Sequence, residues 1–413
     1  MKLSSDLREI GDSHAQRRTC AAAGGTMNAL QHQSNNMRIE SVRWKVGDGW
    51  NRRPGEGSEA QLVLAFASTT ACAIGEPFED LAAAYPRAAI IGCSTAGEIF
   101  DTQVTDESVS VAAIEFDRTR IVCAREPIEK PSQSFAAGAR LAAALPHEEL
   151  VHVLVFSEGL RVNGSELVKG LASALPPHVT VTGGLSGDGH RFGRTYVIWD
   201  GRPEEGSIVA CGLYGSSIRV GYASLGGWDS FGPERLITKS VHNVLYELDG
   251  RSALELYKQY LGDHAAALPA SGLLFPLSLR TSPGDPPVVR TILAVNEADQ
   301  SMTFAGDVPV GAYARLMKAN FDRLIDGAAG AARVSQGALG SGSPDLALLI
   351  SCVGRKMVLQ QRVEEEVEGV RDVVGDRTVL TGFYSYGEIS PFTPSARCEL
   401  HNQTMTITTF SER

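Results

Sequence analysis

The sequence predicts an α/β or α+β fold that consists of two related halves, each with a mixed β-sheet flanked by helices. Short apolar runs, which are typical of buried strands, alternate along the chain with amphipathic segments of helical spacing. The clearest internal match joins a strand–turn–helix–strand–turn unit at 153–184 to a second one at 348–383. In both units a serine precedes an arginine by four residues, with a glycine between them, and a Thr-Gly pair follows the second strand. A unit that recurs in this way indicates two related halves.

The elements of the first half follow from periodicity and capping. Asn163 is placed as an N-cap to which Glu166 can reach back, and Leu167, Leu171 and Leu175 share one helical face. The predicted order is a strand at 62–66, a helix at 77–85, a strand at 88–93, a hairpin of 109–116 and 119–124, a helix at 134–145, a strand at 151–156, a helix at 163–175, and strands at 179–182, 195–199, 207–214 and 219–223.

The second half repeats this alternation. Ser252 and Glu255 form a capping box at the start of a helix that Gly262 ends. The predicted order is strands at 234–239 and 244–248, the helix from Ser252, strands at 272–277, 288–295 and 301–304, a helix at 320–334, a strand at 346–351, a helix at 356–367 and a strand at 378–381.

These elements predict a tail and two modules. Residues 1–57 are polar and lack sustained periodicity apart from 39–44, so we expect a flexible N-terminal tail in which Met27 and Met37 are alternative starts. The first module is expected at 58–226 and the second at 234–411, on either side of a turn-rich junction.

Composition excludes several classes of protein. The 413 residues suffice for two or three domains, and the net charge of −10 disfavours nucleic-acid binding, which needs a basic face. The seven cysteines include no C-x-x-C pair, which favours a reducing compartment and gives no zinc signature. No apolar run approaches the roughly 20 residues of a membrane span. We therefore expect a cytoplasmic protein without a nucleic-acid or membrane partner.

The most informative motif is a glycine-rich turn that follows a strand and ends in an acid. It occurs at 92–99 and 382–389, where the acids are Glu98 and Glu388, and a looser relative lies at 182–188. The backbone N–H groups of such a turn can hold a carboxylate or phosphate, while the acid can hold an amine. We expect the turns to converge around one shared ligand pocket; the alternative is that the acids cap their own turns.

Arg161 and Arg355 each lie at the start of a predicted helix. A guanidinium group there conflicts with the positive end of the helix dipole unless it meets an anion. Both are therefore candidate ligand contacts, with structural pairing to Glu158 or Asp188 as the alternative.

A polar cluster that includes His401 and Asn402 opens the last predicted strand, beside the Tyr384 and Tyr386 turn. It offers several donors and acceptors to a ligand; alternatively, His401 and Asn402 anchor the strand. The full set of candidate ligand-binding residues is Ser94, Thr95, Gly97, Glu98, Arg161, Gly184, Ser186, Asp188, Arg355, Tyr384, Tyr386, Glu388, His401 and Asn402.

No motif typical of catalysis is present: there is no nucleophile elbow, His-x-x-x-His helix, P-loop or dinucleotide fingerprint. We therefore expect a binding protein rather than an enzyme and assign no catalytic residue. The alternative is an enzyme for a small amine or carboxylate substrate, with Glu98 or Glu388 as acid or base. A purely structural role, in which the turns bind nothing, is a third hypothesis.

These phrases, in this order, resemble the FIST family (F-box and intracellular signal transduction proteins), with its N-terminal and C-terminal modules. The resemblance covers about residues 58 to 411. The matching segments are 91–99 and 183–188 in the first module, and 243–250, 257, 261–262, 382–389 and 400–404 in the second.

The resemblance implies a cytoplasmic sensory protein that binds a small ligand, such as an amino acid, and informs a separate signalling partner. A subset of the family consists of haem-binding nitric-oxide sensors that regulate histidine kinases or cyclic-di-GMP enzymes. The cofactor is thus unknown, with haem as one hypothesis, and the candidate haem ligands are His190, His242, His401 and Cys93.

Overall fold

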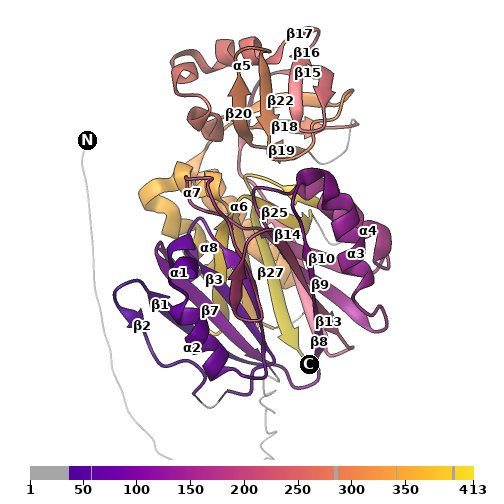
Figure 1. Ribbon diagram of the computed structural model, residues 1–413. Helices are drawn as coiled ribbons and strands as arrows, with labels where there is room; N and C mark the ends of the chain where they lie inside the picture. Colours follow the sequence, from indigo (N-terminus) through magenta and orange to yellow (C-terminus); the bar gives the residue numbers. More distant parts are fainter. Residues whose placement is uncertain (1–36, 57, 283–286, 341, 393–395) are drawn as a thin grey trace, which may run out of the picture. The chain divides into compact units, whose positions relative to one another are not determined.

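A computed structural model describes residues 37–413, except 57, 283–286, 341 and 393–395 (Figure 1). Three of its four sheets share one design: a central parallel pair of strands has antiparallel strands on one side and a hairpin on the other. The predicted α/β class, with mixed sheets, flanking helices and two related halves, is confirmed.

Hydrogen bonding sets the order of the strands in these three sheets. The first consists of β12 (Arg202–Glu204), β11 (Val197–Trp199), β4 (Ala89–Ser94), β3 (Leu62–Ala67), β7 (Ser108–Glu115), β1 (Arg38–Lys45) and β2 (Gly49–Trp50). The second consists of β26 (Cys398–His401), β25 (Gly387–Pro391), β10 (Thr180–Leu185), β9 (Leu150–Ser157), β13 (Ser207–Tyr214) and β8 (Arg120–Pro127). The third consists of β6 (Gln103–Thr105), β5 (Glu98–Phe100), β24 (Val379–Ser385), β23 (Leu346–Cys352), β27 (Met405–Glu412) and β14 (Ile218–Leu225).

The hairpin at the edge of each sheet comes from another part of the chain. β5 follows β4 in the sequence but pairs with β24 of the third sheet. β25 follows β24 but pairs with β10 of the second sheet, and β11 follows β10 but pairs with β4 of the first. The three units therefore close a ring in which each one completes the sheet of another, and the two halves of the chain are interlocked.

One glycine occupies the same place in all three units. A Cβ atom on Gly92, Gly183 or Gly382 would lie 1.8 Å from a backbone oxygen of the parallel neighbour strand. Only a residue without a side chain allows this approach. The motif's first glycine is therefore explained by packing between strands, directly before each turn.

Helices cover the outer faces of these sheets (Figure 1). Asn163 and Asn320 cap two of them through bonds to backbone N–H groups, the first as predicted. None of the described helices is long and apolar enough to cross a bilayer. The helices are α1 (Thr69–Ile74) and α2 (Glu76–Ala84) on the first sheet, α3 (Ser134–Ala143) and α4 (Gly164–Ala174) on the second, and α6 (Phe321–Ala338) and α8 (Val363–Val374) on the third, with α7 (Val353–Leu359) and the 3₁₀ turns η1 (Pro131–Gln133) and η4 (Gln360–Arg362) in connections.

The inner faces of the three sheets share one apolar core. The ring of Phe66 stacks on that of Phe383 with centroids 4.8 Å apart, and it meets the edge of Phe156 at 5.4 Å. These rings come from the first, third and second sheets. Contacts between aromatic rings thus fix the centre of the fold.

The fourth sheet belongs to the segment 229–318. Ser252 caps its helix α5 (Ala253–Leu261) as predicted, by accepting from the Glu255 N–H. The strands are β19 (Val288–Arg290), β18 (Leu277–Arg280), β22 (Tyr313–Lys318), β15 (Asp229–Val241), β16 (Val244–Leu248), β21 (Ser301–Phe304) and β20 (Ile292–Asn296), with β17 (Arg251–Ser252) beside β16. The 3₁₀ turns η2 (Gly262–Ala267) and η3 (Ala270–Leu274) follow α5.

Four predictions of elements are wrong. The hairpin expected from 109–116 and 119–124 does not form, because β7 pairs with β1 and β3 in the first sheet whereas β8 pairs with β13 in the second. The strand expected at 288–295 is divided at Thr291 into β19 and β20, which pair with different neighbours. The strand expected at 272–277 is mostly η3, and β18 begins only at Leu277. A short apolar run cannot be assigned by periodicity alone, because a buried 3₁₀ turn and a buried strand share that pattern. The helix expected at 356–367 is broken into α7 and α8 at Gln360, whose φ is 51°.

The predicted flexible tail also differs from the structure. Residues 38–45 form β1, which pairs along the whole of β7. Val42 and Trp44 point into the core beneath α1 and α2, so the weak periodicity at 39–44 was a strand signal. Residues 1–36 lie outside the described part of the chain, and the module limits at 226 and 234 remain predictions.

Candidate functional site

The three glycine-acid turns meet and bond to one another through their backbones. The N–H of Ala96 in the first turn donates to the Tyr384 carbonyl in the third at 2.8 Å. The Gly187 N–H donates to Ser94 at 2.8 Å, and the Tyr386 N–H donates to Leu185 at 3.2 Å. Each turn thus donates to another turn in a closed ring. The turns converge as the sequence predicts, but they meet through backbone bonds, and the ligand pocket predicted between them remains a prediction.

Glu98 is buried within the junction (1% exposed). Its carboxylate accepts hydrogen bonds from the Thr95 hydroxyl, from the Ser108 hydroxyl at 2.7 Å and from the Ser108 N–H at 3.1 Å. Burial raises the pKa of Glu98 to about 8, although these bonds oppose the shift.

Glu388 repeats this arrangement in the second half of the chain. It accepts from the Ser385 hydroxyl at 2.7 Å, from the Thr404 hydroxyl at 2.9 Å and from the Thr404 N–H at 3.2 Å. Burial raises its pKa to about 8 as well. In each case the acid is held by a hydroxyl three residues earlier and by a Ser or Thr at or directly before the start of a later strand, so both glutamates tie their own turns to the sheet.

The other residues predicted in the turns are also engaged internally. The Ser94 hydroxyl donates to the Gly187 carbonyl at 2.8 Å, and that of Ser186 donates to the Ser157 carbonyl at 2.5 Å. The backbone of Gly97 lies against the Lys356 side chain, where a Cβ would stand 2.5 Å from Nζ. A Cβ on Gly184 would lie 2.9 Å from Ile350, inside the core.

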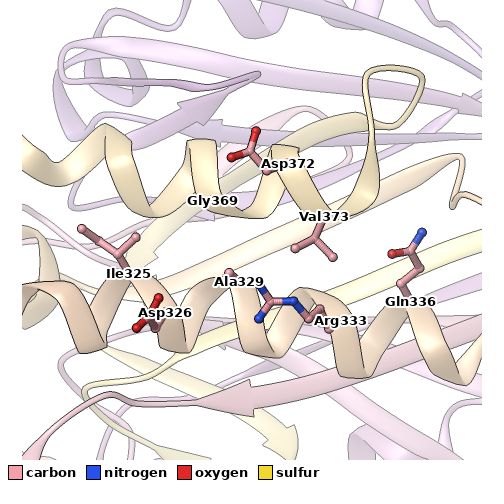
Figure 2. Close-up of a pocket in the computed structure, with 8 residues that line it drawn as sticks. All are labelled: Ile325, Asp326, Ala329, Arg333, Gln336, Gly369, Asp372 and Val373. Atoms are coloured by element: carbon pink, nitrogen blue, oxygen red, sulfur yellow. The ribbon is translucent and has the colours of Figure 1, made fainter. Parts of the chain in front are cut away.

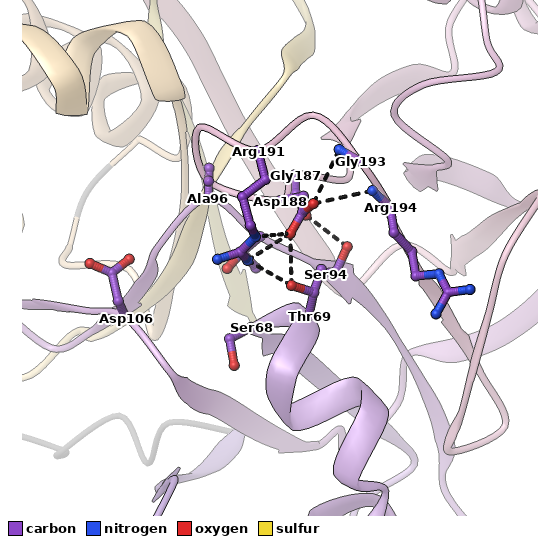
Figure 3. A network of polar contacts seen from close by, with 12 residues as sticks. Ser68, Thr69, Ser94, Ala96, Asp106, Gly187, Asp188, Arg191, Gly193 and Arg194 are labelled. Atoms are coloured by element: carbon purple, nitrogen blue, oxygen red, sulfur yellow. Dashed lines mark hydrogen bonds and ion pairs between the residues drawn. The ribbon is translucent and has the colours of Figure 1, made fainter.

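Asp188 organises the loop that follows the second turn (Figure 3). It accepts from the Thr69 hydroxyl at 2.7 Å, from the Arg191 guanidinium at 2.8 Å and from the N–H of Gly193 and Arg194. Burial opposes its ionisation, but these donors outweigh it and lower the pKa of Asp188. The carboxylate is charged and fully engaged.

The two predicted arginines have different surroundings. Arg161 has a side chain that is 52% exposed and lies 3.4 Å from Glu205. Arg355 is completely buried, pairs with Glu366 at 2.7 Å and donates to the carbonyls of Gly226 and Leu324. The predicted pairing of either arginine with Glu158 or Asp188 through their side chains does not appear among these contacts.

The two tyrosines also make internal bonds. The Tyr384 hydroxyl donates to Glu366 at 2.6 Å, next to the buried ion pair. The Tyr386 hydroxyl donates to the Gly189 carbonyl at 3.0 Å, and its ring stacks on Phe192 with centroids 4.4 Å apart.

The turn between β26 and β27 is different, because it carries unpaired polar atoms. Six buried side-chain atoms in the described residues have no hydrogen-bond partner, and three of them belong to consecutive residues: His401 Nδ1, Asn402 Oδ1 and Gln403 Oε1. An unpaired buried polar group costs roughly 1–3 kcal/mol. Three in a row indicate that this turn needs a further partner, either ordered water or a ligand.

All three unpaired atoms are hydrogen-bond acceptors. His401 Nε2 lies 2.8 Å from the Ser390 carbonyl, so it must carry the proton and Nδ1 must be the acceptor. The amide nitrogens of Asn402 and Gln403 face the carbonyls of Tyr386 and Leu273 at 3.5 and 3.4 Å, which leaves their oxygens free. Burial lowers the pKa of His401 to about 4, so the ring is neutral near pH 7.

This turn lies where the fourth sheet's segment meets the three-sheet body. The side-chain amide nitrogen of Gln403 faces Leu273 of η3, and the backbone carbonyl of Gln403 accepts from the Trp228 indole at 2.8 Å. The Arg290 guanidinium of β19 donates to the Leu400 carbonyl at 2.9 Å. Sequence reasoning missed Arg290, although a charge inside the apolar run 288–295 was a signal for it.

The four candidate haem ligands have different surroundings. His190 and His242 are exposed, and Cys93 is enclosed in the apolar inner core. His401 holds Ser390 through Nε2, and its Nδ1 has almost no accessible surface. Within the described residues no group of three or more His, Cys, Asp or Glu side chains is placed to hold a metal ion.

A separate groove of about 600 Å³ runs between α6 and α8 (Figure 2). Asp326 and Arg333 of α6 and Asp372 of α8 contribute to its lining. It contains none of the predicted ligand-binding residues.

Comparison with known families matches the FIST N domain to residues 61–251 and the FIST C domain to 253–391. No curated protein matches the chain. A solved structure titled "Crystal structure of cyanuic acid hydrolase from A. caulinodans" is 8% identical, with a TM-score of 0.35, and the match covers 91% of this chain and 99% of that one. A likeness at this level supports no conclusion about activity. FIST domains are sensory domains of signalling proteins that bind small ligands, and with both domains matched this chain belongs to the FIST family.

Proposed function

We propose that this protein is a small-ligand sensor whose ligand binds at the turn between β26 and β27. The observation that carries the proposal is the run of unpaired buried acceptors on His401, Asn402 and Gln403. The other predicted residues with engaged polar groups are assigned to the framework around this site.

The chemistry of the turn favours an amino acid or a related zwitterion. Three acceptors require a ligand that is rich in N–H donors, and a protonated amine supplies three. Arg290 is 6% exposed and bonds the turn through Leu400, so its positive charge is available to a ligand carboxylate.

Binding at this turn requires an opening. The unpaired atoms have almost no accessible surface, so we propose that η3 and β19, which contact Gln403 and Leu400, move away before a ligand reaches them. The bonds that close the site, from Gln403 to Leu273 and from Asn402 to Tyr386, are long and correspondingly weak. A ligand that binds only the open form shifts the population toward it, which is the signal we propose.

The output is proposed to pass to a separate signalling protein, such as a histidine kinase or a cyclic-di-GMP enzyme. Family membership supports this step. It is tested by comparing kinase autophosphorylation or cyclic-di-GMP turnover with and without the ligand-loaded protein.

Gln403→Met tests the site directly. Removing an unpaired acceptor is expected to leave the free energy of unfolding unchanged or to raise it by up to about 1–3 kcal/mol, while abolishing the ligand-induced rise in Tm. The measurement is a thermal-shift titration with each of the 20 common L-amino acids.

Ser411→Ala is the matched control, because it removes another unpaired buried oxygen from β27 without touching the turn. It should retain the ligand response. A wild-type protein that responds to no amino acid, or a Gln403→Met variant that responds fully, would refute the proposed site.

The nitric-oxide version of this proposal requires haem, which the surroundings of His190, His242, His401 and Cys93 do not favour. An absorption spectrum of protein produced with ample haem tests it. A stoichiometric Soret band would revive this version.

The enzymatic alternative has one observation in its favour: the pKa of Glu98 and of Glu388 is raised to about 8, in the range of general acids and bases. Against it, both carboxylates are sealed and bonded to their own turns. Loss of turnover of an amine or carboxylate substrate in Glu388→Gln, with Tm preserved, would favour catalysis.

A further inference from the structure

Two cysteines face each other at the edge of the second sheet. In the antiparallel pair of β8 and β13, Cys123 lies directly opposite Cys211. Directly opposed Cα atoms in such a pair are roughly 4.5 to 5.5 Å apart. A disulfide needs a Cα separation of about 4.4 to 6.8 Å, so the backbone is already suited to one.

The two side chains also point to the same face of the sheet. Cys211 belongs to the inner core with Leu154 and Phe156, and Cys123 packs against that same core. Their sequence neighbours Ala210 and Ala124 belong to the opposite face. The thiols therefore meet, with no strand or side chain between them in the ladder.

The two thiols differ in access. Cys123 is half-buried on the outermost strand, whereas Cys211 is fully buried. The neighbouring Cys123 side chain and burial both raise the pKa of Cys211 well above its ordinary value. Because Cys123 is the more accessible of the two thiols, an oxidant reaches it first, and Cys211 serves as the second partner.

We propose that Cys123 and Cys211 form a peroxide-reactive dithiol that closes to an intramolecular disulfide. In the first step hydrogen peroxide converts the Cys123 thiol to a sulfenic acid and releases water. The Cys211 sulfur then displaces hydroxide from the Cys123 sulfur, and its proton leaves with that hydroxide as a second water. Two thiols are oxidised and one peroxide is reduced.

The bond would act on an edge strand. β8 ends the second sheet, and the residues before it are held by Glu412 of β27 through the N–H groups of Asp117, Arg118 and Thr119. A disulfide would fix β8 covalently to β13 and restrict the unfolded chain. Oxidation would therefore act on the second sheet at β8, independently of the ligand site at the β26–β27 turn.

Peptide mapping tests the proposal. Native full-length protein is treated with hydrogen peroxide, capped with N-ethylmaleimide and digested with trypsin without reduction. We expect the peptide 121–125 linked to the peptide 195–219, a loss of two of the seven thiols and about 2 Da of mass, and a raised Tm. Dithiothreitol should reverse all of these.

The variants separate the pair from other thiols. Cys123→Ser, at a half-buried edge position, should abolish the link; Cys398→Ser removes the other half-buried described thiol and should leave it intact. The proposal is overturned if Cys123 accumulates as sulfinic acid beside a free Cys211. It is also overturned if Cys398 reacts while Cys123 stays reduced.

Discussion

Arg355 and Glu366 form an ion pair whose side chains are both 0% exposed. Glu366 also accepts from Ser351 and Tyr384, so every charge in this cluster has a protein partner. The unpaired acceptors of the β26–β27 turn are buried as well, but they have no such protein partners. This contrast separates residues that stabilise the fold from the residues that we propose bind the ligand.

Arg355→Met is expected to lower the free energy of unfolding by about 3–5 kcal/mol, because it leaves the Glu366 carboxylate buried without its cation. Urea unfolding measures the loss. Arg161→Met is the control: its side chain is 52% exposed, and surface pairs contribute about 1 kcal/mol or less. Equal losses in the two variants would contradict a structural role for the Arg355 pair.

Elements in this protein are held together by close approaches of backbone, repeated in three units. The parallel pairs β3–β4, β9–β10 and β23–β24 each require a glycine where the neighbouring strand's carbonyl approaches. The turn that follows each glycine is thereby fixed against the next unit's turn.

Gly183→Ala should therefore destabilise the protein by more than about 2 kcal/mol, since overpacking forces the backbone apart. Gly337→Ala, in α6 where an added Cβ would have nothing within 4 Å, should be neutral or slightly stabilising. Chemical denaturation of both variants provides the comparison. A tolerated Gly183→Ala would mean that the strands can separate freely.

At the scale of the whole molecule, the exchange of hairpins makes the two modules depend on each other. β5 of the first module completes the third sheet, and β25 and β26 of the second module complete the second sheet. Each isolated module would leave sheet edges open and hairpins without a partner.

The segments 37–226 and 227–413, which keep β1 and the whole of β15 and β27, are expected not to unfold cooperatively when produced separately, whereas co-expression should restore a joint cooperative transition. Circular dichroism during heating distinguishes these outcomes. A sharp transition in either segment alone would show that the exchanged hairpins are dispensable.

Stability should also depend on pH in a defined window. The pKa of Glu98 and Glu388 is raised to about 8 by burial, so the folded state holds protons that the unfolded state releases. The contribution of these two protonated carboxyl groups to the free energy of unfolding is complete below the unfolded-state pKa of about 4.3, and it is lost as the pH rises to 8. Burial lowers the pKa of His152 to about 3 and of His401 to about 4, so their contribution is lost as the pH falls below about 6.5.

Between pH 6.5 and 8 the glutamates dominate, and the free energy of unfolding should fall by up to about 2 kcal/mol for each. Urea unfolding across this range measures the slope. The Glu98→Gln/Glu388→Gln variant should flatten it, and an unchanged slope would place the titration elsewhere.

Local signals in the sequence were sufficient for much of the fold. The caps at Asn163 and Ser252 bond as their spacing predicts, and most buried strands coincide with apolar runs. The failures fall where one pattern has two physical meanings, as at η3, or where a break depends on one residue's backbone, as at Gln360.

The candidate site was predicted less completely. The convergence of the turns follows from their repeated place after parallel strands, and both acids are buried there. The number of partners that each side chain finds depends on residues far away in the sequence, such as Arg290 beside the turn at His401.

By itself the sequence determined the α/β class, the repeated unit, the caps and the family, because these depend on spacing and residue type within short stretches. Only the tertiary structure decided which polar groups are paired. The glutamates find partners in their own turns and at Ser108 and Thr404, and Arg355 of α7 pairs with Glu366 of α8, whereas His401, Asn402 and Gln403 are brought into a buried turn with acceptors left over. Hydrogen-bond satisfaction is a property of the whole packed molecule, and no local pattern encodes it.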